Sequence, residues 1–195
     1  MNNIKIYNNF FDKNDIDKIF EIITNSSYTC NCLERSYQNR YGATSYFQNA
    51  KLMEYSFITE YCKKILYKVV KTNFRILRCN LLCNSNGQTG SFHVDHEAEY
   101  GLTEYKNHQN TNTTQFTIMI YVNYNEHYKE PTKNVLNNIL PTSSIIFKTD
   151  KKHLIEIETI HNRLVMFPAY YVHKPHEYTG KDIRTAITFK CEYID

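Results

Sequence analysis

The feature that most constrains the fold is a change in hydrophobic pattern near residue 73. Before it, apolar residues recur at helical spacing in two stretches, 13–24 and 51–71. After it come short strand-like runs separated by turn residues, and no helical stretch of useful length interrupts them. A sheet built from βαβ units is therefore not expected, because parallel strands need crossover helices. The pattern predicts a mainly β sandwich or barrel preceded by two helices.

The pattern also predicts where each element lies. In addition to a short strand at 4–7, strands are expected at 74–83, 91–95, 115–124, 144–148, 154–157, 163–167, 173–178 and 184–193. Asp12 is expected to cap the first helix. Residues 28–50 show no clear period and are expected to be irregular or to form short strands. Two polar segments, 97–114 and 125–143, are expected to be loops.

Length and charge narrow the class of protein. A chain of 195 residues fits one domain, with a helical part at 1–72 and a β core at 73–195. A hydrophobic fraction of 42% argues against disorder, and a net charge of +3 is too small to indicate a dedicated nucleic-acid binder. No apolar run approaches the length of a membrane span, and the first residues lack a signal-peptide pattern. We expect a soluble, cytoplasmic protein without a membrane partner, and the sequence indicates no oligomeric state.

The six cysteines favour packing over chemistry. A chain of this length does not need disulfides, and the thiols of an intracellular protein stay reduced. Zinc is a weaker alternative, because the candidate ligands Cys30, Cys32, Cys79 and Cys83 lack the C-x2-C spacing of a zinc knuckle. We therefore expect buried thiols that behave as small apolar side chains.

His93 and Asp95 are the first candidates for chemistry. They lie two residues apart on an expected strand, so alternation projects both side chains to the same face. An imidazole and a carboxylate on one face can bind a metal, and a second histidine from elsewhere would complete a facial triad suited to Fe(II) and oxygen chemistry. The H-x-D pattern is common by chance, so this interpretation depends on the rest of the chain.

Further motifs supply that context. Asn86-Gly87-Gln-Thr-Gly90 leads into His93-Val-Asp95, and Tyr121-Val122-Asn123 follows on the next strand. Toward the C-terminus come, in order, Phe167-Pro168, His173, Gly180 and Arg184. Together these motifs, within residues 73–193, resemble the 2-oxoglutarate/Fe(II)-dependent dioxygenases, especially the prolyl 4-hydroxylase-like branch. The resemblance implies a double-stranded β-helix, or jelly roll, with the two N-terminal helices packed outside.

The resemblance also implies a metal and a co-substrate. Fe(II) would be held by His93, Asp95 and His173, with 2-oxoglutarate as co-substrate; ascorbate is a further cofactor that the family allows. His176 competes with His173 for the third ligand position, and the family's spacing from Phe167-Pro168 favours His173. His96 is expected to be exposed or to lie behind the ligands. The remaining histidines are expected at the surface: His108, His127, His153 and His161.

Three residues are implied for the co-substrate. The guanidinium fork of Arg184 would bind the distal carboxylate of 2-oxoglutarate. Tyr121, expected on the same strand face as Met119, could offer its hydroxyl to that carboxylate. The family's serine two residues after the arginine is Ala186 here, and Thr188 could substitute for it. The resemblance thus names His93, Asp95, His173 and Arg184 as the catalytic set.

The implied reaction is hydroxylation by O2, coupled to oxidative decarboxylation of 2-oxoglutarate to succinate. A protein or peptide side chain, such as prolyl, is the leading substrate, and a nucleobase or small molecule is the alternative. Relatives that act on nucleic acid often carry a second arginine six residues after the first, where this chain has Lys190. The family's Gly-Gly-Glu-Thr segment is absent and 125–143 stands there instead. We expect 97–114 and 125–143 to border the active site and govern substrate choice.

Two readings of another class stay open at this point. A non-enzymatic jelly-roll binding module, with or without zinc, would not turn over 2-oxoglutarate. A cupin-type enzyme with another metal would need additional histidine or glutamate ligands, which are not evident in the sequence. The joint presence of His93, Asp95, His173 and Arg184 favours the oxygenase over both.

Overall fold

The structure is a computed structural model of the chain. It describes residues 3–25, 29–32, 45–48, 52–84, 90, 92–95, 114–122, 144–148, 154–176 and 184–194. Within these ranges, side chains are not described at 22–25, 29–32, 45–48, 52–60, 80, 81, 83 and 84. The predicted loops 97–114 and 125–143 therefore lie outside the described residues, apart from Thr114.

Two helices form the N-terminal layer, α1 (Lys13–Asn25) and α2 (Leu52–Val70). Asp12 caps α1 as predicted, because its Oδ1 accepts a hydrogen bond from the Asp15 backbone N–H at 2.9 Å. The Tyr61 hydroxyl on α2 donates to the Asp15 carboxylate, which ties the two helices together. Neither described helix is long and apolar enough to cross a membrane.

The strands form two main antiparallel sheets and one separate pair. The larger sheet has the order β1-β8-β5-β10-β4 and the smaller has the order β7-β6-β9, while β2 pairs with β3. The bounds are β1 (Lys5–Tyr7), β2 (Thr29–Cys32), β3 (Ser45–Gln48), β4 (Phe74–Asn84), β5 (Gln115–Tyr121), β6 (Ser144–Lys148), β7 (Leu154–Glu158), β8 (Arg163–Pro168), β9 (His173–Pro175) and β10 (Arg184–Tyr193).

The order of the strands is that of a jelly roll. β4 and β5 lie in the larger sheet, with the His93 segment beside the smaller sheet between them in the chain. β6 and β7 follow in the smaller sheet, β8 returns to the larger one, β9 lies in the smaller one, and β10 lies in the larger one. The segment around His93 adds a further edge beside β9 through an antiparallel bridge to His173. This winding confirms the predicted mainly β fold, a double-stranded β-helix with two helices outside.

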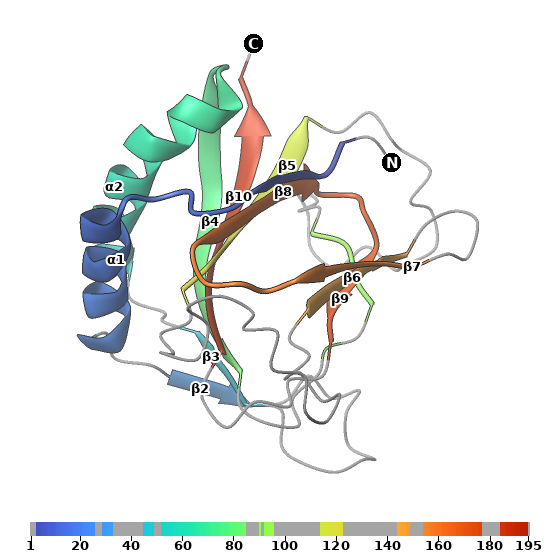
Figure 1. Ribbon diagram of the computed structural model, residues 1–195, viewed down its shortest axis with the longest axis horizontal. Coiled ribbons are helices and arrows are strands. Elements are labelled where there is room, and N and C mark those ends of the chain that lie inside the picture. The colour runs from blue at the N-terminus through green and yellow to red at the C-terminus, as the bar shows by residue number, and fades with distance from the viewer. Residues whose placement is uncertain are drawn as a thin grey trace, which may run out of the picture.

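The larger sheet has a different partner on each face (Figure 1). One face packs against α1 and α2 through a buried cluster that includes Ile19, Leu66, Ile120 and Phe189. The other face turns toward the smaller sheet and contributes to a second buried cluster, which contains Tyr121, Phe147, Val165, Phe167 and Ala186. Because strand residues alternate between faces, β5, β8 and β10 contribute to both clusters.

Most element bounds match the expectations within a few residues, with two informative differences. The strand predicted at 91–95 is reduced to a single bridge at His93. The reason is that the Asp95 N–H donates to the carbonyl of Ala169, in the turn after β8, rather than continuing along β9. The expected strand at 115–124 ends at Tyr121, and 28–50 contains the short strands β2 and β3.

Candidate metal centre and active site

The backbone brings His93 and His173 side by side. The His93 N–H donates to the His173 carbonyl at 2.9 Å, and the His173 N–H donates back to the His93 carbonyl at the same distance. Such a reciprocal pair places two residues directly opposite each other across an antiparallel bridge. Their imidazole centroids are 4.4 Å apart. Residues 80 positions apart in the chain therefore present their rings to one point.

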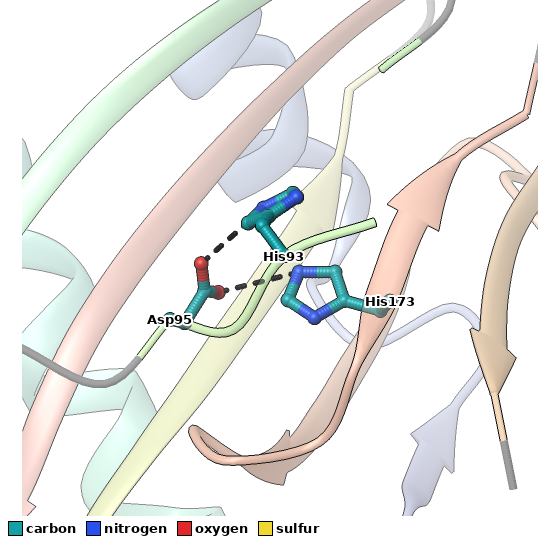
Figure 2. Close-up of side chains that lie close together, drawn as sticks. All are labelled: His93, Asp95 and His173. Atoms are coloured by element: carbon teal, nitrogen blue, oxygen red, sulfur yellow. Dashed lines mark ion pairs between the residues drawn. The ribbon is translucent and has the colours of Figure 1, made fainter. Parts of the chain in front are cut away.

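Asp95 completes this group, and all three side chains converge in Figure 2. Its Oδ1 lies 3.6 Å from His93 Nε2, and its Oδ2 lies 3.5 Å from His173 Nε2. Both separations exceed an ordinary hydrogen bond, which is about 2.7–3.2 Å. One candidate ligand atom from each residue lies within 4.8 Å of the others. Bonds of about 2.0–2.2 Å to a central ion would fit ligand atoms with this spacing.

The donor set also fits Fe(II) chemically. Two imidazoles and one carboxylate are the ligands of non-haem Fe(II) oxygenases, in which the remaining coordination positions stay open. Among the described residues, this is the one group of three or more histidine, cysteine, aspartate or glutamate side chains with metal-binding spacing. His93 is partly exposed while Asp95 and His173 are buried, so the group has one solvent-facing side.

His173 is prepared for metal binding by its surroundings. Its Nδ1 lies 2.8 Å from the Tyr171 carbonyl, which accepts a hydrogen bond from Nδ1–H and leaves Nε2 with its lone pair toward Asp95. Burial lowers the pKa of His173 to about 4, with Asp95 opposing and His93 assisting the shift. The imidazole is therefore neutral at pH 7. Phe147 and Phe167 pack around the ring.

Asp95 is held by two residues of the larger sheet. The Thr117 hydroxyl on β5 donates to Oδ2 at 2.8 Å, and the Lys190 ammonium on β10 forms an ion pair with Oδ1. Thr117 and Lys190 are direct partners in the register of these strands. Burial alone would raise the pKa of Asp95, but its interactions with His173, Lys190 and His93 outweigh burial and hold the pKa below its usual range. The carboxylate is ionised at neutral pH.

The sequence analysis did not foresee that Thr117, Tyr171 and Lys190 contact the candidate metal ligands. Lys190 is the charged residue among them. It was considered there only as the residue that replaces a second arginine. A signal was available, because Lys190 lies six residues after Arg184 and alternation places both on one strand face. Alternation does not reveal that this face of β10 contacts the His93–Asp95 segment, because that contact depends on how the sheet packs against the segment.

The residues predicted for the co-substrate lie on the same inner face of the larger sheet. Arg184, Tyr121 and Thr188 are all buried. Tyr121 shares its face with Met119, as expected, and its hydroxyl lies 3.8 Å from the Met119 sulfur. Burial raises the pKa of Tyr121 despite the nearby positive charge of Arg184, so the phenol stays protonated. The buried Thr188 hydroxyl has no hydrogen-bond partner among the described residues, which is consistent with a place for a polar ligand atom.

The other histidine candidates do not join this group where they are described. His176 lies three residues beyond His173 and is absent from the metal-spaced group. Its backbone N–H donates to the Ser144 carbonyl. His161, expected at the surface, is partly buried in the turn that connects β7 to β8. His96, His108, His127 and His153 lie outside the described residues.

The zinc alternative gains no support from the described thiols. Among the described side chains, Cys62, Cys79 and Cys191 form no disulfide; Cys62 and Cys191 are buried and Cys79 is partly buried. None of the three belongs to a metal-spaced group in the described part of the chain. The side chains of Cys30, Cys32 and Cys83 lie outside the described residues, so that part of the hypothesis stays untested.

Comparison with known proteins gives the class of the fold. The sequence matches no protein-family model and no curated protein. The structure is similar to a prolyl hydroxylase from Trichoplax adhaerens, solved in complex with a peptide fragment of the hypoxia-inducible factor oxygen degradation domain. The TM-score is 0.59 at 16% identity, over 100% of this chain and 84% of that one.

Two further solved structures agree with this class. A 2OG-Fe(II) oxygenase family protein from Burkholderia pseudomallei has a TM-score of 0.66 at 8% identity, over 97% of this chain and 85% of that one. HygX from Streptomyces hygroscopicus, solved with nickel and 2-oxoglutarate bound, has a TM-score of 0.64 at 8% identity, over 98% of this chain and 83% of that one. The protein therefore has the fold seen in solved 2-oxoglutarate/Fe(II) oxygenases, a prolyl hydroxylase among them.

Proposed function

We propose that the protein is a 2-oxoglutarate- and Fe(II)-dependent oxygenase that hydroxylates a protein or peptide side chain, as prolyl hydroxylases do. The observation that carries the proposal is the convergence of His93, Asp95 and His173 within metal-binding distance on this fold. Arg184 provides further support, because it is buried on the same inner face and its guanidinium fork matches the geometry of a carboxylate. Each of these residues was named from the sequence.

In this proposal, His93, Asp95 and His173 hold Fe(II). When bound, the metal and 2-oxoglutarate supply O2 activation, with 2-oxoglutarate converted to succinate and carbon dioxide. The chain contributes binding and orientation. Tyr171 and Thr117 fix the directions of the His173 ring and the Asp95 carboxylate. The surrounding aromatic rings keep water away from His173.

The co-substrate is proposed to lie between the metal ligands and Arg184. The Arg184 guanidinium would bind its distal carboxylate bidentately, and the protonated Tyr121 hydroxyl could donate to the same group. Thr188 lies between Arg184 and Lys190 on the inner face of β10, so its buried hydroxyl faces the path between the two ends of the site. This arrangement suits a short dicarboxylate with one end at the metal.

Two of the similar structures suggest candidate classes of substrate. A peptide substrate is favoured because one similar structure is a prolyl hydroxylase holding a peptide fragment. A small-molecule substrate is the second candidate, because HygX was also solved with hygromycin B bound. We also propose that the whole chain forms one domain, in which residues 1–72 are the helical part and residues 73–195 the β core.

The metal ligands are tested by replacing Asp95 with alanine. We expect Fe(II) affinity, measured anaerobically by calorimetry, to fall at least about 100-fold, because loss of even a supporting group behind a ligand typically costs 10–100-fold. Succinate release should be abolished. The control is Asp17→Ala, which removes an exposed carboxylate from α1. Full Fe(II) binding or full succinate release by Asp95→Ala would refute the assignment.

The reaction and substrate are tested on the wild-type protein. Succinate release is measured with Fe(II), 2-oxoglutarate, O2 and ascorbate, against proline-containing peptides, oligonucleotides and small metabolites. A gain of one oxygen atom in a peptide, seen by mass spectrometry, would support the leading proposal. Oxidation of a small molecule or nucleobase alone would move the function to that class. Metal binding without any 2-oxoglutarate turnover would identify a non-catalytic binding module.

A further inference from the structure

The contact between Lys190 and Asp95 is not explained by the proposed reaction alone. Lys190 lies on β10, and its side chain is only 13% exposed. Its ammonium forms an ion pair with Asp95 Oδ1, whose side chain is 5% exposed. A long, flexible lysine side chain is normally found with its ammonium in water. Here it is directed into the protein, at a carboxylate that belongs to the candidate metal centre.

Without a metal, Asp95 needs a compensating charge. A buried carboxylate is strongly destabilising unless it is paired and hydrogen-bonded. Thr117 satisfies one oxygen with a neutral hydrogen bond. The nearest ring nitrogens of His93 and His173 lie 3.6 Å and 3.5 Å from the Asp95 oxygens, beyond an ordinary hydrogen bond. Among the described residues, Lys190 is the one lysine or arginine in an ion pair with Asp95.

We propose that Lys190 is the built-in counter-ion of Asp95, which keeps the carboxylate charged, buried and correctly oriented while the centre is free of metal. The inference rests on the proposed function, in that Asp95 is taken as a metal ligand. When the metal binds, it supplies positive charge to the same carboxylate. Lys190 and the metal then both compensate the charge of the Asp95 carboxylate, so their contributions to the free energy of unfolding are not additive.

This non-additivity gives Lys190 two opposite effects. In the metal-free protein it stabilises the fold, because it offsets the buried negative charge. In the loaded protein its positive charge lies close to a dication and weakens metal binding. Lys190 is thus a positioning residue. It holds Asp95 in place before the metal binds, and it lowers the affinity for the metal. Packing of the lysine stem alone would instead stabilise the metal-free and loaded forms equally.

The test compares Lys190→Met with wild type by thermal unfolding, with and without Ni(II), and by Ni(II) titration. Methionine keeps the length of the apolar stem and removes the charge. We expect the metal-free variant to unfold at a lower temperature and to gain more from Ni(II) than wild type does. We also expect its Ni(II) dissociation constant to be at least about threefold lower, because the repulsion between the ammonium and the ion is gone.

Three further variants make the result specific. Lys148→Met, at an exposed position on β6, should behave as wild type. Lys190→Arg should keep most of the metal-free stability, because it keeps the charge. In an Asp95→Asn background, Lys190→Met should lose much less metal-free stability than it does in the wild-type background, because the anion to be compensated is absent.

The outcomes separate this inference from the proposed function. A wild-type protein that Ni(II) does not stabilise would contradict the metal centre itself, and this inference with it. If Ni(II) stabilises wild type and Lys190→Met by the same amount, the metal centre stands and the counter-ion role is wrong. A weaker Ni(II) affinity in Lys190→Met would also overturn the proposal, since it would make Lys190 a promoter of metal binding.

Discussion

Asp95 and Arg184 are the two aspartate, glutamate, lysine or arginine side chains that are buried among the described residues. Burying a charge is costly, so a folded protein retains one where it has a paired or ligand-binding role. Asp95 is paired with Lys190 and hydrogen-bonded by Thr117. Arg184 lies along the same face of β10, four residues from Thr188. At the scale of single residues, the positions of these two charges mark the two ends of the candidate site.

Replacement of Arg184 by alanine should raise the 2-oxoglutarate requirement far more than it changes Fe(II) affinity. Loss of one partner from a desolvated charge pair costs about 2–5 kcal/mol, which corresponds to a fall in affinity of at least about 30-fold. The measurement is the 2-oxoglutarate dependence of succinate release, with Fe(II) affinity determined separately. Arg75→Ala is the matched control, because Arg75 is an exposed arginine paired with Glu192 on the opposite end of the sheet. An unchanged requirement in Arg184→Ala would exclude the proposed anchor.

At the scale of elements, β10 carries both the core and the site. Ile187 and Phe189 face the helices, and Ala186 belongs to the inner cluster. Lys190 reaches Asp95 on that inner side. The strand is an interior strand of the larger sheet, hydrogen-bonded on one side to β4 and on the other to β5. A central, doubly paired strand is a rigid support, so groups on its inner face are held in fixed positions.

Neighbouring substitutions on β10 should therefore separate stability from binding. Ile187→Val should lower the free energy of unfolding by about 1 kcal/mol and leave 2-oxoglutarate affinity unchanged, because Ile187 is fully buried on the helix side. Thr188→Val should weaken 2-oxoglutarate binding while costing little stability, because the lost hydroxyl has no protein partner in the described structure. Denaturant unfolding and calorimetry measure the two effects. Equal 2-oxoglutarate affinity in Thr188→Val and wild type would mean that the hydroxyl does not contact the co-substrate.

Asn162 joins the N-terminal segment to the turn between β7 and β8. Its side chain accepts a hydrogen bond from the Phe11 N–H at 2.9 Å and donates one to the Phe11 carbonyl at 2.8 Å. Its own N–H donates to the Tyr121 carbonyl, and its φ of 60° lies in the left-handed region. Asparagine is one of the few non-glycine residues that adopt this region readily.

Asn162→Ala should lower the free energy of unfolding by about 2–4 kcal/mol, because two buried backbone groups of Phe11 lose their partners. Asn162→Gly should lose the same hydrogen bonds but about 1 kcal/mol less in total, because glycine adopts positive φ without strain. Chemical denaturation of both variants checks this. If alanine and glycine were equally destabilising, the left-handed conformation would carry no measurable strain.

At the scale of the whole molecule, the helical part and the sheet are built around one continuous core. The larger buried cluster contains Ile16 and Ile19 from α1, Leu66 from α2, and Ile120 and Phe189 from the sheet. Helices whose apolar faces are covered by the sheet are not expected to be stable alone, since helix stability in proteins comes chiefly from such packing. The shared core favours the single-domain organisation predicted from length.

Thermal unfolding should accordingly show one cooperative transition. Far-ultraviolet circular dichroism reports the helices and strands together, and near-ultraviolet dichroism reports the packing of the tyrosines. We expect the two probes to give the same midpoint, as for a two-state domain. Two separated midpoints, with the helical signal lost first, would indicate that residues 1–72 and the jelly roll unfold independently.

The sequence by itself determined the class of fold and most of the site. Helical periodicity before residue 73 and short strands after it predicted the two helices and the mainly β core, because these periods express which face of each element is buried. The types and order of His93, Asp95, His173 and Arg184 named the candidate metal ligands and the candidate co-substrate anchor. Local sequence patterns are sufficient to predict which face of its own strand or helix a residue occupies.

Only the tertiary structure decided which side chains meet. The pairing of His93 with His173, rather than with His176, depends on a backbone bridge between segments 80 residues apart in the chain. The loss of the predicted strand at 91–95 follows from a hydrogen bond of Asp95 to the turn after β8. The ion pair of Lys190 with Asp95 depends on how the larger sheet packs against that segment. Such contacts are set by the register and packing of strands distant in sequence, which no local periodicity specifies.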